Sequence, residues 1–481
     1  MHRLLFYISL LISGWCSAQA DSVWSYTVGG GSQDHLIKMT KDSSGNVWSV
    51  GSTWSAAGMG NQILVVNTDS MLNCIQSFDL GDEGVQSGQD VWVAPDQSIW
   101  ILSSSSGPTT NGYDPSLFQL NTAGDLVQEK VLLSEGWQNA ESFHCYEHQF
   151  LVAGYSWNSD LLNQAEVWIW DPVAPNHLQV SLPIVGYDMH APLVAWDSTA
   201  QSWMAVFNYW TTQDSLPNTS VFWINESGTV VQSIVNAPLC KGIQMWDAVP
   251  HNGSWTAAGG FLENGVFRGH LMYWNVDGSM ANAAAFPATP TESILRSIEL
   301  KGEGDGYVVA GWTYYFGAGF ADAYIHGLDF NMIWLGGGAI GGAMVDKVKD
   351  VFSFSRNTLM MVGENASQDA NQGAQGWLLK FNDDYITTSD LPITLGQVDC
   401  LDLDVTEESG GSTLNVYFDG NECVFSETVQ NIRLYNLQGQ LVASDKVLSH
   451  HWLPNTNVQG IYLLTVTSVS GAQHTFKVSL N

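Results

Sequence analysis

The sequence is poor in basic side chains. Its 481 residues include only 15 Lys and Arg against 47 Asp and Glu, which gives a formal net charge of -32 and a pI near 4.3. Such a chain repels phosphate backbones and anionic membrane surfaces, which argues against nucleic acid as a partner. Charged residues are nevertheless only 13% of the total, and 21 Trp and 47 Gly indicate a folded, aromatic-rich protein rather than a disordered acidic tail.

Cysteine is also scarce. None of the six cysteines shows the Cys-x-x-Cys spacing typical of a metal site, and no other pattern predicts a metal or cofactor. Cys16 lies near the N-terminus, which leaves five for the rest of the chain. Cys400 and Cys423 lie in one C-terminal segment and could pair in an oxidising compartment, although spacing alone does not establish the geometry of a disulfide.

Long apolar runs are missing beyond the N-terminus. Residues 1–20 resemble a secretory signal peptide, with a basic start at Arg3, the apolar run LLFYISLLIS, and a small-x-small cleavage site at Ala18 and Ala20. This run is shorter than the ~20 residues that span a bilayer, and no later segment is longer. The sequence therefore predicts export from the cytoplasm and no transmembrane segment.

Local catalytic motifs and helical periodicity are missing as well. We find no nucleophile elbow, P-loop or paired-carboxylate signature, and the acidic stretches GEGDGY (302–307) and LDLD (401–404) lack the spacing of a calcium loop. An active site assembled from distant segments would leave no local motif, so an enzyme stays open as an alternative. The lack of a 3.6-residue apolar period excludes helical solenoids.

A seven-fold repeat organises most of the chain. The run GYVVAG (306–311) has counterparts whose last residues, here called the anchor residues, are 51, 103, 154, 207, 259, 311 and 363, at intervals of 51 to 53. In the fifth unit four strand-like runs follow one another, at 242–249, 254–259, 270–276 and 279–286. Four antiparallel strands in ~52 residues make one propeller blade. The sequence predicts an all-β fold with a seven-bladed β-propeller over residues 21–384.

The two ends of the repeat array complement each other. The seventh unit stops after its third strand, AQGWLLKFN (374–382), so its fourth strand is missing. At the other end of the array, VWSYTVGG (23–30) precedes the first unit. It resembles NMIWLGGG (331–338), which precedes the seventh unit in the same way. We expect the N-terminal strand to complete the last blade and to close the ring without a free sheet edge. The segment YITTSD (385–390) is a rival for that position.

The connections between strands are of two kinds. One face carries tight polar turns, whereas the other, here called the long-loop face, carries longer loops at 53–61, 103–115, 155–164, 208–219 and 312–322. Aromatic side chains in these loops are candidate ligand contacts, by stacking on a sugar or peptide. They are Trp54, Trp157, Tyr209, Trp210, Trp312, Tyr314 and Tyr315. The alternative is that they cap the gaps between blades.

The strand pattern changes after a linker at 385–397. The runs LNVYFDG (414–420), NIRLYNLQGQLVAS (431–444), QGIYLLTVTS (459–468) and AQHTFKVSL (472–480) predict a small Ig-like β-sandwich over 398–481. This segment resembles the C-terminal sorting domain of the type IX secretion system of Bacteroidota, whose members carry strands like IRLYNLQGQLV and QGIYLLTVTS and end on a strand. It departs from that family in lacking the Pro-Asn-Pro opening and in having only Lys477 as a basic residue in its last strand.

The resemblance implies the type IX machinery as a partner and a secreted or cell-surface location, with the tail usually removed. The alternative for this segment is a generic Ig-like adhesion module. For the whole chain the sequence favours non-catalytic binding of an extracellular glycan or protein through the long-loop face. The competing hypothesis is a secreted hydrolase or lyase whose active site draws residues from several blades.

Overall fold

The computed structural model describes most of the chain, and all the regular structure in the described part is β-strand. The described residues are 23–29, 32–54, 61–81, 84–106, 114–132, 137–157, 162–171, 177–212, 214–235, 242–263, 266–275, 280–285, 292–302, 305–314, 320–355, 358–367, 373–382, 397–399, 416–419, 422–435, 441–446, 449–452, 460–468 and 473–480. None of them belongs to a helix long and apolar enough to cross a membrane. The predicted signal peptide, its cleavage site, Tyr315 and Cys400 lie outside these residues.

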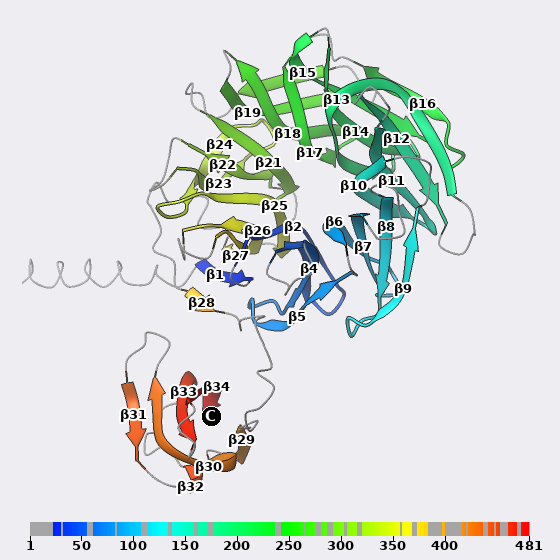
Figure 1. Ribbon diagram of the computed structural model, residues 1–481. Helices are drawn as coiled ribbons and strands as arrows, with labels where there is room; N and C mark the ends of the chain where they lie inside the picture. The colour runs from blue at the N-terminus through cyan, green and yellow to red at the C-terminus, as the bar shows by residue number, and fades with distance from the viewer. Residues whose placement is uncertain are drawn as a thin grey trace, which may run out of the picture. The chain divides into compact units, whose positions relative to one another are not determined.

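Seven antiparallel blades of four strands follow one another around a ring (Figure 1). We call the strands of each blade A to D from the centre outward. Blade 1 contains β2 (Asp34–Lys41), β3 (Val47–Thr53), β4 (Gln62–Thr68) and β5 (Cys74–Leu80). Blade 2 contains β6 (Val85–Val93), β7 (Ile99–Ser106), β8 (Asp114–Leu120) and β9 (Leu126–Val131). Blade 3 contains β10 (Trp137–Tyr146), β11 (Gln149–Trp157), β12 (Asn163–Trp170) and the first half of β13 (His177–Asp197).

The second half of β13 is the A strand of blade 4, so these two blades share one continuous strand. Blade 4 continues with β14 (Ser202–Thr211), β15 (Asp214–Ile224) and β16 (Val230–Val235). Blade 5 contains β17 (Ile243–His251), β18 (Ser254–Glu263), β19 (Val266–Asn275) and β20 (Met280–Ala285). Blade 6 contains β21 (Ser293–Leu300), β22 (Tyr307–Thr313), β23 (Asp322–Leu328) and β24 (Trp334–Ile340). The predicted seven-bladed propeller is confirmed.

The N-terminal strand closes the ring, as the sequence predicts. Blade 7 contains β25 (Asp346–Ser355), β26 (Thr358–Asn365) and β27 (Gln375–Asn382), and β1 (Val23–Val28) pairs antiparallel with β27. The register runs from Val23 opposite Phe381 to Val28 opposite Gly376. A short strand, β28 (Gln397–Asp399), adds in parallel to the outer side of β1. The rival segment 385–390 lies outside the described residues.

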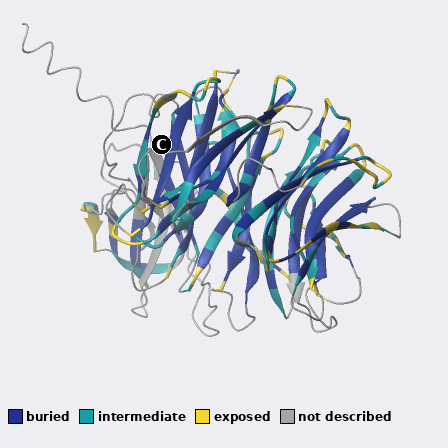
Figure 2. Ribbon diagram, turned by 90° about the horizontal axis from the view of Figure 1, so that it is seen from above, coloured by how far each residue is buried: buried dark blue, intermediate teal, exposed yellow. Residues whose placement is uncertain are grey.

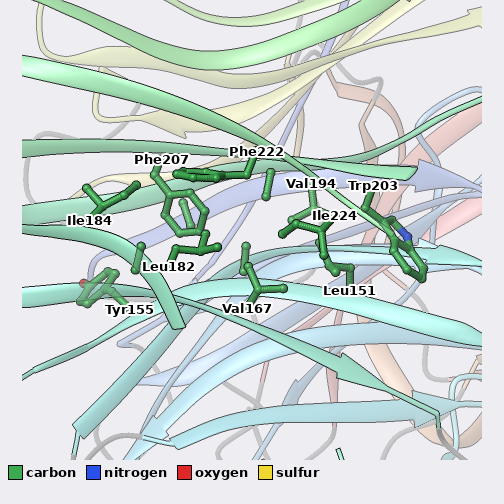
Figure 3. Close-up of a cluster of buried hydrophobic side chains, with 14 of the residues drawn as sticks. Leu151, Tyr155, Val167, Leu182, Ile184, Val194, Trp203, Phe207, Phe222 and Ile224 are labelled. Atoms are coloured by element: carbon green, nitrogen blue, oxygen red, sulfur yellow. The ribbon is translucent and has the colours of Figure 1, made fainter. Parts of the chain in front are cut away.

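Seven apolar clusters fill the seven gaps between neighbouring blades. In the gap between blades 3 and 4, Val167 packs with Trp203 and Phe207 (Figure 3). The B and C strands are buried on both faces because a blade lies on each side of them, whereas turns and outer strands carry the exposed residues (Figure 2). This burial explains why the anchor motif is a continuous apolar run rather than an alternating one.

Every A strand carries a β-bulge opposite the end of its B strand. The register shifts between Leu36 and Lys38 in blade 1, and at the equivalent place in each other blade. The bulge brings the preceding backbone carbonyl against the anchor residue. A Cβ on Gly311 would lie 1.9 Å from the Ile294 oxygen, and the anchor glycines of blades 1, 3, 5 and 7 meet a carbonyl at 1.9 to 2.0 Å. The repeated glycine is therefore required by close backbone approach.

Residues 405–481 form a separate compact unit. Its strands are β29 (Val416–Asp419), β30 (Glu422–Tyr435), β31 (Leu441–Asp445), β32 (Ser449–Trp452), β33 (Gly460–Ser468) and β34 (Gln473–Leu480). The long β30 pairs with four of the others, so all six strands share one hydrogen-bonded sheet around a core that includes Phe425, Ile432 and Trp452. The four strand runs expected from the sequence are present, and β30 begins earlier than expected.

Two neighbouring glycines in blade 5 test the close-approach argument. We expect Gly259→Ala to lower the free energy of unfolding by about 2–3 kcal/mol, because its Cβ would lie 2.0 Å from the Gln244 carbonyl oxygen and the backbone must shift. Gly260→Ala is the matched control, since the nearest atom to its Cβ would be in the Phe267 ring at 3.2 Å and the nearest backbone atom would be the Arg268 oxygen at 3.7 Å. Denaturant unfolding of both variants measures the difference, and equal losses would contradict the argument.

Candidate functional site

The bulged residue of every blade faces the centre of the ring. The seven A strands contact one another in sequence around a central channel. A cavity of about 240 Å³ lies in this channel, and each blade contributes its bulged residue to the lining. These residues are Ile37, Gln89, Glu141, Pro192, Trp246, Arg296 and Lys349, and His35, Lys38 and His190 complete the lining. The bulges thus assemble one site from seven distant segments.

The A strands begin on the long-loop face, where Asp34 pairs with Thr53 at the end of β3. In β2, β6, β21 and β25 the bulged residue is the fourth or fifth from that end, so the cavity lies at this level of the channel. A second cavity of about 320 Å³ lies beside it between blades 7 and 1, and both cavities are lined by His35. We call the region where the channel meets the long-loop face the channel mouth.

A ring of polar contacts lies behind the cavity. In blades 2, 5 and 7 the residue that follows the bulge is an aspartate whose carboxylate reaches the next blade. There the Asp247 carboxylate accepts the Ile298 N–H at 3.1 Å, and the Asp90 carboxylate accepts the Phe143 N–H at the same distance. Asp350 accepts the Met39 N–H at 3.2 Å and forms an ion pair with Lys38 at 3.0 Å, which joins blade 7 to blade 1. These contacts fix the A strands relative to one another.

Burial changes the protonation of several groups around the channel. Burial raises the pKa of Asp90 to about 7 and that of Glu299 to about 8, and for Glu299 the charges of Asp247 and Asp350 add to the effect. Burial alone would lower the pKa of Lys38, but Asp350 and the neighbouring carboxylates raise it well above its usual value. Lys38 therefore serves as the counter-charge of the carboxylate ring.

Two other cations line the cavity. The Arg296 guanidinium stacks on the Trp246 ring at 3.8 Å, and the Lys349 ammonium lies 5.2 Å from the centre of the Trp312 ring. Burial lowers the pKa of Arg296 to about 10 and that of Lys349 to about 8. Within the described part of the chain, neither side chain forms a hydrogen bond or an ion pair.

The acidic group of the cavity, Glu141, is fully engaged. One carboxylate oxygen lies 3.0 Å from His190 Nδ1, and the other accepts the Ala191 N–H at 2.7 Å. Burial alone would lower the pKa of His190, but Glu141 outweighs it and raises the pKa. Glu141 therefore holds blade 3 against blade 4. Among the described residues, no group of three His, Cys, Asp or Glu side chains is placed to hold a metal ion.

The structure separates the predicted aromatic residues. Trp54, Trp157 and Tyr314 are about half exposed at the ends of their strands. Trp210 is half-buried, and Trp312 is half-buried beneath Lys347 and Lys349. Tyr209 is only 3% exposed and packs in the core between blades 3 and 4, so it does not belong to the surface. The prediction of a long loop at 208–219 is wrong. The strands β14 and β15 continue to a short turn, where Thr211 pairs with Asp214.

An exposed aromatic pair lies on the long-loop face beside the channel. Trp137, the first residue of β10, stacks on Trp157 with 5.5 Å between ring centres and 10° between planes. The two side chains are 43% and 44% exposed. Tyr187, at the start of the A strand of blade 4, is also exposed. Trp137 and Tyr187 are not among the residues predicted from the sequence, because they lie at strand starts and not in long loops.

Comparisons with known proteins add little to this site. The sequence matches no protein-family model, and no curated protein matches it. A variant of the Synechocystis apocarotenoid oxygenase is similar in structure, at 10% identity and a TM-score of 0.38 over 76% of this chain and 73% of that one. BBS1N in complex with ARL6DN is similar at 8% identity and a TM-score of 0.42, over 77% of this chain and 97% of that one. A thermostable family-43 glycoside hydrolase is similar at 10% identity and a TM-score of 0.32, over 51% of this chain and 91% of that one. These likenesses carry no argument about ligand or activity.

The buried carboxyl of Glu299 predicts a pH dependence. Its pKa is raised in the folded state, so between about pH 4.5 and pH 8 the folded chain binds a proton that the unfolded chain has lost, and stability falls as the pH rises. We expect Glu299→Gln to remove this loss, so that its stability relative to wild type increases from pH 5 to pH 8.5. Denaturant unfolding at each pH measures the free energy of unfolding of both proteins. Glu226→Gln, at an exposed turn, is the control. A constant difference across this range would refute the expectation.

Proposed function

We propose that this protein is a secreted or cell-surface recognition protein that binds a glycan on the long-loop face without catalysis. The observation that carries the proposal is the stacked Trp137–Trp157 pair, which leaves a flat apolar surface exposed beside the channel mouth. The exposed indole faces supply a flat surface on which a sugar ring can stack.

A binding function accounts for the site better than the alternative, a secreted hydrolase or lyase. Hydrolysis of a glycosidic bond usually needs two carboxyl groups that face each other across the substrate. Glu141 is the carboxylate in the lining of the channel cavity, and both of its oxygens hold the blades together. Peptide recognition by the same aromatic surface is an outcome that the binding test distinguishes.

Replacement of the tryptophan pair tests glycan binding. On a glycan and peptide array, we expect the chain from residue 21 onward to bind a glycan. Trp137→Ala and Trp157→Ala should each weaken binding about tenfold or more, because the stacking surface is lost. Val127→Ala, at an exposed position of the outer strand β9, is the control and should bind like wild type. Unchanged affinity in both tryptophan variants, or binding to peptides alone, would rule out the proposal.

The proposed route to the cell surface is the type IX secretion system of Bacteroidota. The two motifs that carry the resemblance form neighbouring strands, since Leu434 of β30 pairs with Leu464 of β33. The last strand, β34, pairs with β33 along its whole length. This arrangement supports the proposal that the C-terminal unit is a compact sorting signal, with residues 1–20 directing the first step of export.

A reporter fusion tests the sorting proposal. In a bacterium with this secretion system, we expect a reporter that carries a signal peptide and residues 391–481 to reach the cell surface or the medium. A matched fusion that ends at residue 459 lacks β33 and β34 and should stay in the periplasm, because the sheet cannot form. Fractionation and immunoblotting measure both. Retention of the full fusion in the periplasm would leave a generic adhesion module as the better interpretation.

A further inference from the structure

The channel mouth contains two cations that contact aromatic rings of neighbouring blades but form no ion pair within the described residues. Lys38 is paired with Asp350 in the polar ring, whereas Arg296 and Lys349 form no ion pair within the described residues. This is unusual in a chain with 15 basic and 47 acidic side chains, because carboxylates are abundant. The charges of Glu141, Asp247 and Asp350 act on Arg296, and that of Glu364 acts on Lys349. Burial outweighs these charges and lowers the pKa of both groups.

Both side chains are held in place before any ligand arrives. The Arg296 guanidinium lies 3.8 Å above the Trp246 ring, which fixes the plane of its N–H donors. Lys349 is the bulged residue of β25, and its ammonium lies 5.2 Å from the Trp312 ring centre. Burial holds the pKa of both groups below the usual values, so a nearby negative charge would be favourable for each.

The remaining lining indicates the kind of anion. Ile37 and Pro192 are apolar, and Gln89 supplies one neutral amide. The Glu141 carboxylate also lies in the lining, where it contacts His190 and accepts the Ala191 N–H. Asp90, Asp247 and Asp350 lie behind the lining and repel a second negative charge. A guanidinium fork matches the two oxygens of a carboxylate. A cavity of about 240 Å³ has room for a small organic group.

We propose that the channel mouth binds a monocarboxylate, with Arg296 and Lys349 holding the carboxylate and the apolar side chains contacting the body of the ligand. The carboxylate could belong to a free acid or to an acidic sugar within a polysaccharide. Neither Trp137 nor Trp157 lines this cavity, so the proposal is independent of the proposed glycan binding and is tested separately.

Calorimetric titration of the chain from residue 21 onward tests the site. The probes are glucuronate, its neutral counterpart glucose, inorganic phosphate, and polygalacturonate as a polymeric carboxylate. We expect glucuronate to bind at least tenfold more tightly than glucose and phosphate. Binding of polygalacturonate as well would identify a polymer as the source, and binding of glucuronate alone would identify a free acid. Failure of both carboxylates to bind would overturn the proposal.

Substitutions locate the binding. Arg296→Gln and Lys349→Met should each weaken glucuronate binding at least tenfold, and Arg296→Lys should weaken it less, because the charge is kept and the fork is lost. Lys347→Met is the matched control. It removes a cation from the same strand that pairs with Glu364 at 3.4 Å and does not line the cavity, so affinity should stay within twofold of wild type. If Arg296→Gln does not fold, the Lys349→Met and Arg296→Lys variants decide. Equal loss in Lys347→Met and Lys349→Met would show a general effect of charge and would refute the site.

Discussion

The architecture depends on a close approach between two backbones, repeated around the ring. Just before each bulge, the A strand places a carbonyl oxygen against the anchor residue of the B strand, and in five blades only a glycine fits there. The contact allows the A strand to hold one extra residue without losing its pairing with the B strand. A one-residue slip without the bulge would exchange the two faces of the strand. The glycine therefore permits the close approach in these five blades, whereas blades 2 and 4 form the bulge with Ser103 and Phe207 as anchor residues.

This bulge gives two adjacent residues different tasks. The bulged residue faces the channel. In blades 5 and 7 the residue after it, Asp247 or Asp350, accepts a hydrogen bond from a backbone N–H of the next blade. Apolar packing takes place farther out, between the B and C strands of neighbouring blades. The central ring can therefore be polar without weakening the core. Some lining side chains, such as Glu141 and Lys38, also take part in contacts between blades.

Much of the fold could be predicted from the sequence, and the site could not, for one physical reason. The B and C strands are buried on both faces, so they consist of apolar residues. An apolar run that ends on a glycine therefore recurs in the sequence every ~52 residues. The channel position recurs at the same spacing, but its residues differ in every blade, from Ile37 to Glu141 to Lys349. Its bulge also breaks the alternation that marks a strand. The sequence predicts Tyr209 in a loop because its neighbours in the sequence are polar. In the structure it is paired in a strand and buried.

The charge of the chain sets the conditions under which the channel mouth could hold an anion. A net charge of -32 repels an approaching carboxylate at long range, and this repulsion is screened over roughly 8–10 Å at physiological ionic strength. Inside the cavity, contacts with Arg296 and Lys349 act over a few ångströms between partly dehydrated groups and are screened less. Moderate salt should therefore help an anion to arrive while costing little of the contact energy. An acidic surface and a cationic channel are compatible because the two act over different distances.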